Sequence, residues 1–333
     1  MKSECQNTGF VGQLSLISTG CSGPPMGENA KISTYRGLCA RMKSFGIILA
    51  VGYGLILLAG CTAQTETSLK YSDERLTLKT DTGRDIPLRL LTPEGCKTCA
   101  LVIFSHGANS TNDRYNNLLL PMAQAGYRVA IPNHTDSEQH PNRTDYDAQD
   151  WTPTRLEDYA TIASQYETNY LIAAGHSFGA LIAQIAGGAQ LPNMPNIDLP
   201  SPRAVLAYSP PGAVPNYIPA TSWSSMTVPS LVTTGTTDIV PMMAGTWEMH
   251  LTSYDQAPSE LAYALIYQSM DHYMNGAYGR ETDDKTMERQ KAVKHLIESS
   301  LFFVSNLRNN NLPSAKQWET QEENFVEVRA HHE

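Results

Sequence analysis

Runs rich in apolar residues alternate along this chain with segments whose apolar residues recur at helical spacing. The runs predict buried strands at 100–105, 127–132, 170–175, 204–208, 231–234 and 261–268. Helical spacing predicts helices at 115–126, 153–166, 178–189 and 283–307. Two alternating runs, 76–80 and 85–92, flank a turn and predict a hairpin. This order predicts an α/β fold with a mostly parallel central sheet and helices on both faces.

The limits of one domain follow from where this alternation begins and ends. We expect a single domain over 76–307, in which 261–268 is the last strand. Residues 308–333 are polar, and they are expected to form a loosely held tail. Residues 61–75 are expected to form a tether in front of the domain.

An apolar segment at 45–60 precedes the tether. It is short for a spanning helix, which needs about 20 residues, and it follows Arg41 and Lys43. A basic start, an apolar centre and small residues at the end predict a secretory signal peptide. Its last residues, Leu-Ala-Gly-Cys at 58–61, resemble a bacterial lipobox, which implies cleavage before Cys61 and lipidation of that cysteine. We therefore expect a lipoprotein anchored in a bacterial cell envelope, with an uncleaved membrane anchor as the alternative.

Two neighbouring residues refine the targeting. Thr62 follows the lipidation site, where an aspartate is associated with inner-membrane retention in enteric bacteria, so the outer membrane is favoured. Met42 would be a normal start for the signal peptide, and we expect residues 1–41 to lie upstream of the true start.

Composition is that of a globular protein, with 41% hydrophobic and 17% charged residues. The formal net charge is −9, although residues 1–60 carry more basic than acidic side chains. The folded domain is therefore acidic, which argues against nucleic acid or anionic lipid as its partner. We expect a small-molecule or lipid ester as the partner, membrane association through the anchor alone, and no obligate protein partner.

Cys96 and Cys99 form a lone Cys-x-x-Cys pair just before the predicted strand at 100–105. A redox motif usually opens a helix, and a zinc site needs further cysteine or histidine ligands. In an oxidising compartment, a local disulfide that closes a turn is the favoured interpretation, ahead of a free thiol pair.

The sequence Gly175-His176-Ser177-Phe178-Gly179 lies between a predicted buried strand and a predicted helix. This is the Gly-x-Ser-x-Gly pattern in the strand–turn–helix setting that a nucleophile elbow requires. The turn is sharp, and glycine at 175 and 179 avoids clashes that larger side chains would cause. The positive end of the following helix also favours developing negative charge. Ser177 is therefore the candidate nucleophile, and a chance match is the alternative.

Asp238 is the candidate acid because it follows the strand at 231–234 through a glycine-containing turn. In this arrangement the acid comes after the serine in the chain and before the histidine. Its role is to hold the histidine in one tautomer and to stabilise its cation. Asp255 and Asp271 are alternatives, but Asp271 adjoins the histidine and is badly placed to orient its ring.

His272 is the candidate base because it lies between the last predicted strand and the terminal helix. Apart from His250, it is the only histidine between Asp238 and that helix. Its role would be to take the proton of Ser177 and return it to the leaving alcohol. The alternative is a capping or surface histidine.

The oxyanion donors are expected from two backbone N–H groups, those of Ala108 and Phe178. Each such donor stabilises the transition state by about 3–4 kcal/mol. Gly107 lets the backbone approach the substrate, and His106 is expected to have a structural role.

Four segments together look like one known family: 102–107 (VIFSHG), 125–130 (AGYRVA), 155–158 (RLED) and 175–179 (GHSFG). They resemble the α/β-hydrolases related to plasma platelet-activating-factor acetylhydrolase and the dienelactone-hydrolase-like esterases. The resemblance covers about 76–306. It implies the α/β-hydrolase fold and hydrolysis of short-acyl or small esters without a cofactor or metal. We interpret Arg155 and Asp158 as an ion pair on a helix surface, worth under about 1 kcal/mol.

The irregular stretches 192–203 and 209–229 are the expected sites of substrate selection. Tyr208, Tyr217 and Trp223 are candidates for the substrate pocket, with core packing as the alternative. The favoured function is a serine carboxylic-ester hydrolase. An acyltransferase with the same triad and a non-catalytic envelope binding lipoprotein remain alternatives, and fold alone does not choose among them.

Overall fold

A computed structural model describes residues 68–192, 194, 197–241, 243–278, 286–318 and 325–330. The predicted signal segment and Cys61 lie outside the described residues. Within the described residues, none of the helices combines the length and the apolar character that crossing a membrane requires.

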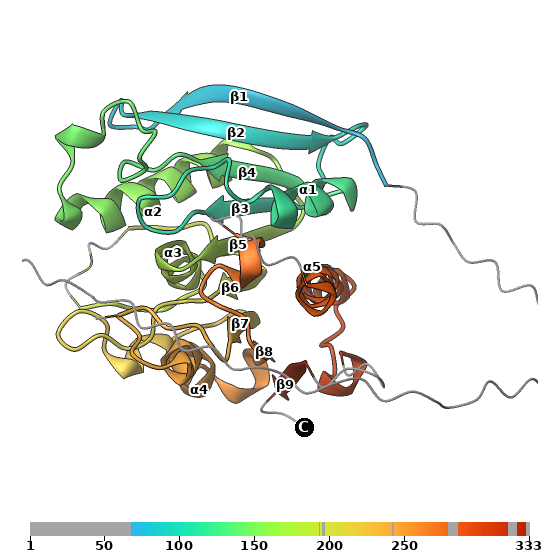
Figure 1. Cartoon of the computed structure of the whole chain (residues 1–333). Coiled ribbons are helices and arrows are strands. Elements are labelled where there is room, and N and C mark those ends of the chain that lie inside the picture. Colours follow the sequence, from blue (N-terminus) through green and yellow to red (C-terminus); the bar gives the residue numbers. More distant parts are fainter. Residues whose placement is uncertain are drawn as a thin grey trace, which may run out of the picture. The chain divides into compact units, whose positions relative to one another are not determined.

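One sheet forms the centre of the domain, and its strands run in the order β1-β2-β4-β3-β5-β6-β7-β8-β9 (Figure 1). Strands β3 to β8 pair in parallel, whereas β1, β2 and β9 pair antiparallel with their neighbours. The strands are β1 (Tyr71–Lys79), β2 (Asp85–Pro93), β3 (Leu101–Ser105), β4 (Arg128–Pro132), β5 (Leu171–His176), β6 (Ala204–Tyr208), β7 (Ser230–Gly235), β8 (Ala262–Tyr267) and β9 (Val326–Ala330).

Helices cover both faces of this sheet, as the apolar pattern predicted (Figure 1). Each face has its own core: α1 and α5 pack on one side, and α2, α3 and α4 on the other. The helices are α1 (Asn116–Gln124), α2 (Ala148–Gln165), α3 (Phe178–Ala186), α4 (Thr252–Gln256) and α5 (Met287–Arg308).

The central strands are continuous apolar runs because both of their faces are covered. Every residue of β3, β5, β6, β7 and β8 is buried. Helix α3 is buried along almost its whole length and, apart from Phe178 and Gln184, consists of small and aliphatic residues. Such a helix can pack closely on the sheet directly behind the predicted serine turn.

The two edges of the sheet differ from the prediction. The hairpin β1–β2 is present, but β1 begins at Tyr71, ahead of the expected domain start. The expectation that β8 is the last strand is wrong, because β9 pairs with it antiparallel. Part of the predicted tail, 308–333, therefore belongs to the sheet and covers what would otherwise be an open edge.

The structure places a disulfide between Cys96 and Cys99, with the two Cα atoms 5.6 Å apart. It closes the turn that joins β2 to β3, where the sequence favoured a local disulfide.

Candidate active site

Ser177 occupies the sharp turn between β5 and α3 with φ 54° and ψ −122°, a conformation that costs free energy for any residue except glycine. A Cβ on Gly175 would lie 2.2 Å from the Gly179 carbonyl oxygen. A Cβ on Gly179 would lie 1.9 Å from the Ser105 carbonyl oxygen. Both glycines are therefore required for the close approach of α3 to the strands, and the turn lifts Ser177 above the sheet.

Asp238 follows β7 and His272 follows β8, so two neighbouring parallel strands deliver them to the same edge of the sheet. His272 Nδ1 lies 2.8 Å from Asp238 Oδ1, and the other carboxylate oxygen accepts a hydrogen bond from Thr234 Oγ1 at 2.9 Å. Burial alone would raise the pKa of Asp238. The hydrogen bonds and charges of two histidines, His250 and His272, outweigh it and hold that pKa well below its usual range. Asp238 is therefore an ionised acceptor that fixes one tautomer of His272.

A second contact holds His272 through its backbone. The Nε2–H of His176, the residue before the serine, donates to the His272 carbonyl oxygen at 2.8 Å. Burial lowers the pKa of His176 to about 3, and the nearby His272 adds to this effect. His176 is therefore neutral in the working pH range, and it links the serine turn to the loop that carries His272.

The predicted oxyanion donors both face the same pocket as Ser177. Gly107 N–H donates to the Tyr115 hydroxyl at 2.9 Å, and Asn109 N–H donates to Asp136 Oδ2 at 2.8 Å. These two anchored amides hold the backbone on either side of Ala108. Phe178 is the first residue of α3, where a backbone N–H has no partner within the helix.

The oxyanion loop rests on a buried ion pair. Arg155 binds both oxygens of Asp136 (2.9 and 2.8 Å) and donates to the His106 carbonyl oxygen at 2.6 Å. Its guanidinium also lies over the ring of Phe178, 4.5 Å from the centroid. Arg155 and Asp136 are fully buried. Arg155 therefore supports the segments that carry both predicted oxyanion donors.

The interpretation of Arg155 and Asp158 as a helix-surface pair is wrong, because both side chains are fully buried. Asp158 instead lies 2.7 Å from His134 Nδ1 and 2.7 Å from a guanidinium nitrogen of Arg84. Burial raises the pKa of Asp158 to about 7, against the opposing charge of Arg84. Helical spacing alone could not show that this face of α2 points into the protein.

His106 is held inside the oxyanion loop by both ring nitrogens. Nε2 accepts from the His134 N–H at 3.1 Å, so Nδ1 carries the hydrogen and donates to the Gly107 carbonyl oxygen at 2.8 Å. Burial holds the pKa of His106 well below its usual range. Neither nitrogen is directed to a substrate.

A pocket of about 680 Å³ opens above Ser177. Most of its wall is aliphatic or aromatic, and its polar groups come chiefly from the serine and two histidines. The lining residues are Ala108, Ala148, Trp151, Thr152, Ser177, Phe178, Leu181, Leu191, Pro211, Val214, Tyr217, Ile218, Val240, Met243, Ala244, His250 and His272.

Of the three aromatic residues proposed for this pocket, Tyr217 lines it, whereas Tyr208 and Trp223 do not. Tyr208 is fully buried on β6, where its hydroxyl donates to Ser300 Oγ of α5. Trp223, within the stretch 209–229, is fully buried and donates its indole N–H to Gln184 at 2.8 Å. The prediction for these two residues is therefore corrected to core packing.

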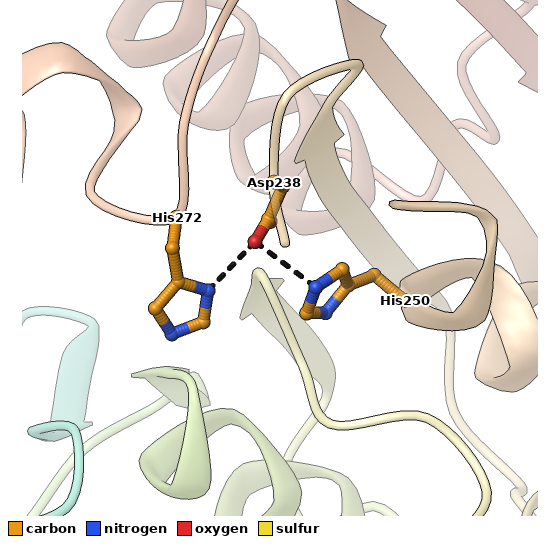
Figure 2. A group of neighbouring side chains, drawn as sticks. All are labelled: Asp238, His250 and His272. Atoms are coloured by element: carbon orange, nitrogen blue, oxygen red, sulfur yellow. Dashed lines mark hydrogen bonds and ion pairs between the residues drawn. The ribbon is translucent and has the colours of Figure 1, made fainter. Parts of the chain in front are cut away.

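Sequence reasoning assigned no role to His250 or Asp136. His250 lies at the end of η3 (Trp247–Leu251), and its Nε2 is 2.9 Å from the same Asp238 oxygen that His272 contacts (Figure 2). One ligand-type atom from each of Asp238, His250 and His272 lies within 4.8 Å of the others. Because two imidazole nitrogens lie within 2.9 Å of one carboxylate oxygen, we interpret this group as an acid–base cluster.

Comparisons with known proteins give a consistent picture. Residues 60–191 match the family model described as chlorophyllase. Chlorophyllase-1 of Citrus sinensis is 27% identical over 139 residues, and the match covers 39% of this chain. Chlorophyllase-1 of Citrus unshiu gives the same values. This match spans 42% of the length of these relatives. The match to the family model ends at residue 191, soon after the serine motif.

Solved structures resemble the chain over most of its length. A Klebsiella pneumoniae protein described as a dienelactone hydrolase covers 71% of this chain and matches over 99% of its own length (TM-score 0.54, 15% identity). Est1E of Butyrivibrio proteoclasticus covers 69% and matches over 99% of its own length (TM-score 0.51, 14% identity). An acylaminoacyl peptidase of Pyrococcus horikoshii covers 70% and matches over 41% (TM-score 0.52, 13% identity). Together with the sheet order and the serine turn, these likenesses show that the chain has the α/β-hydrolase fold.

Proposed function

We propose that the protein is a serine carboxylic-ester hydrolase that uses Ser177, His272 and Asp238. One observation carries the proposal: a serine on a strained turn shares an apolar pocket with a histidine whose Nδ1 is held by a buried carboxylate. Matches to hydrolases of several kinds support a hydrolase of this type.

In the proposed reaction, His272 Nε2 takes the proton of Ser177 while Oγ attacks the ester carbonyl carbon. The negative charge that develops on the carbonyl oxygen is stabilised by the N–H groups of Ala108 and Phe178, at about 3–4 kcal/mol for each donor. The His272 cation is stabilised by Asp238 and then returns its proton to the leaving alcohol. Water then takes the place of the alcohol: His272 removes its proton while the water oxygen attacks the acyl carbon. The bond from that carbon to Ser177 Oγ breaks, His272 returns the proton to Oγ, and the carboxylic acid is released.

The pocket favours a larger substrate than the short or small esters that the family resemblance implied. A volume of about 680 Å³ is in the range of pockets that enclose drug-sized ligands, and the wall is largely apolar. We therefore propose an ester in which the acyl or the alcohol group is bulky and apolar. The matched relatives are named chlorophyllase, so chlorophyll belongs among the substrates to be tested.

We also propose that the enzyme acts in a bacterial cell envelope and is held there by lipid on Cys61. The signal-like segment at 45–60 and the Leu-Ala-Gly-Cys sequence support this. Metabolic labelling with an alkyne fatty acid is expected to label the native protein and not Cys61→Ala. Equal labelling of both proteins would contradict it.

The direct test is hydrolysis of p-nitrophenyl esters from acetate to decanoate, and of chlorophyll, by the full chain. Ser177→Ala is the matched control, because it removes only the attacking oxygen. We expect turnover that is highest for esters with larger apolar groups and that is lost in the variant. Turnover that persists in Ser177→Ala would refute the proposed nucleophile.

A further inference from the structure

Three side chains of the described residues lie within hydrogen-bond or ion-pair distance of the Asp238 carboxylate: His272, Thr234 and His250. Figure 2 shows the two histidines reaching the same oxygen from opposite sides. His250 is 1% exposed, whereas the His272 side chain is 13% exposed and faces the pocket. The acid of the proposed triad therefore serves two imidazoles at once.

The contacts of His250 define its protonation. Its Nδ1 lies 2.6 Å from the Pro210 carbonyl oxygen, which only accepts hydrogen bonds, so Nδ1 carries a hydrogen. Its Nε2 lies 2.9 Å from Asp238 Oδ1, which is ion-pair distance, although the two atoms do not meet hydrogen-bond geometry. In a neutral ring this nitrogen would place an unshared electron pair, rather than positive charge, beside a buried negative oxygen. The favourable state therefore has a hydrogen on each nitrogen, which makes His250 a buried cation paired with Asp238.

We propose that His250 is a positioning residue: a buried imidazolium that shares the charge of Asp238 with His272 and ties the acid to the pocket loop at Pro210. This inference rests on the proposed function, because it assumes that His272 is the base. Pro211, the next residue of that loop, lines the pocket. Burial alone would lower the pKa of His250, but the hydrogen bond and charge of Asp238 outweigh it, so that pKa is raised.

The consequence concerns the proton that His272 carries during the reaction. In a relay of one carboxylate and one histidine, protonating the histidine forms a neutral pair. Here the carboxylate is already paired, so the proton moved from Ser177 Oγ to His272 Nε2 leaves two cations beside one anion. The His272 cation is therefore less stable. A less stable cation gives its proton more readily to the leaving alcohol.

Other groups around His272 do not change the sign of this effect. The ring of His176 lies 4.8 Å away and is neutral, with its pKa lowered to about 3. The phenol of Tyr278 is buried, which raises its pKa and keeps it uncharged. Tyr273 packs edge-on against His272. The Asp271 carboxylate accepts from the N–H groups of Tyr273 and Asn275 rather than from a ring.

Two substitutions remove the charge and leave an amide that can donate a hydrogen bond. In His250→Gln the amide can donate toward Asp238, and in His250→Asn toward Pro210. For both we expect the acid limb of the kcat/KM profile to move to higher pH by about one unit, because loss of the neighbouring positive charge makes the protonated form of the base more stable. His295→Gln is the matched control. His295 lies on α5, is buried against Tyr267 of β8, and does not line the pocket. An acid limb unchanged in both His250 variants would overturn the proposal.

A second measurement does not depend on turnover or on a His250 variant. Imidazole ¹⁵N–¹H spectra of the full-length Ser177→Ala protein at pH 7 are expected to show hydrogens on both nitrogens of His250. One protonated nitrogen would refute the inference. Doubly protonated His250 in a protein whose native form hydrolyses no ester would sink the proposed function while leaving the assignment of this cation intact.

Discussion

Two buried groups of charged residues flank Ser177, and they differ in their access to the pocket. The acid cluster, Asp238 with His250 and His272, reaches the pocket through its two histidines. The support cluster, Arg155 with Asp136, is fully buried and ends on backbone groups of the oxyanion loop. The first can move a proton to and from a substrate. The second can only hold the oxyanion loop in position.

One α/β-hydrolase fold therefore uses buried charge in two ways. Breaking a buried ion pair by removing one partner leaves an uncompensated charge, which costs about 3–5 kcal/mol. Substitutions in the support cluster are therefore expected to lower the free energy of unfolding. Substitutions in the acid cluster are expected to lower kcat.

Asp238→Asn is expected to lower kcat by about 10⁴-fold, since an amide no longer fixes the His272 tautomer or stabilises its cation. Steady-state kinetics on the best p-nitrophenyl ester measures this. Asp271→Asn is the control, because that carboxylate is adjacent in sequence but bonds backbone amides, and its kcat should fall by less than about tenfold. Comparable losses in the two variants would contradict the assignment of the acid.

Asp136→Asn is expected to lower the free energy of unfolding by about 3–5 kcal/mol, because Arg155 is left buried beside a neutral amide. Urea unfolding followed by circular dichroism measures the change. Lys294→Gln removes an exposed pair with Glu298 and should cost under about 1 kcal/mol. A stable Asp136→Asn protein with a large loss of kcat would contradict this separation, because Asp136 would then act on the rate and not on stability.

Val214 lines the pocket and belongs to neither cluster, so the larger side chain of Val214→Trp would take up part of the pocket volume. We expect the ratio of kcat/KM for decanoate to that for acetate to fall by about tenfold or more, since pocket volume discriminates through a few kcal/mol. Leu69→Trp, at an exposed position outside the pocket, should leave the ratio unchanged. A ratio insensitive to Val214→Trp would show that acyl chains bind elsewhere.

Stability should fall as the pH falls from about 6.5. Burial lowers the pKa of His176 to about 3, so below 6.5 the unfolded chain binds a proton that the folded chain does not. His250 contributes to the free energy of unfolding in the opposite direction. Because its pKa is raised in the folded protein, its contribution is fully present below pH 6.5 and is lost as the pH rises through that pKa. Unfolding at pH 7, 6, 5 and 4 measures the acid slope. His176→Asn should reduce it by up to about 1.4 kcal/mol per pH unit, and an unchanged slope would argue against a buried neutral His176.

Much of the fold was predictable because its signals are local. Buried parallel strands need continuous apolar runs, and five of the described strands are buried at every position. The β9 strand escaped prediction because it is a short edge strand with only partly buried side chains, so its sequence resembles a polar tail. Edge strands carry little apolar periodicity, since one side of them faces solvent.

The candidate site was predictable where chain order and turn chemistry determine it. Ser177 lies in a motif that only a sharp turn explains, and the order of the other two residues leaves few choices. The structure places Asp238 and His272 within 2.8 Å of each other. Partners such as His250 and Asp136 have no local signal, because their role depends on which distant group they face. Tyr208 and Trp223 were misplaced for the same reason: an aromatic residue near a loop packs in a core as readily as it lines a pocket.

Labelling with a fluorophosphonate directly tests whether Ser177 is a nucleophile activated by His272 and Asp238, since this reagent reacts with activated serines. The full chain is treated at pH 7.5 and digested, and the modified peptide is sequenced by mass spectrometry. We predict a single adduct on Ser177, formed at a rate that falls by orders of magnitude in Asp238→Asn and His272→Ala. An adduct on another residue, or an equal rate in all three proteins, would contradict the assignment of Ser177, His272 and Asp238 as one catalytic unit.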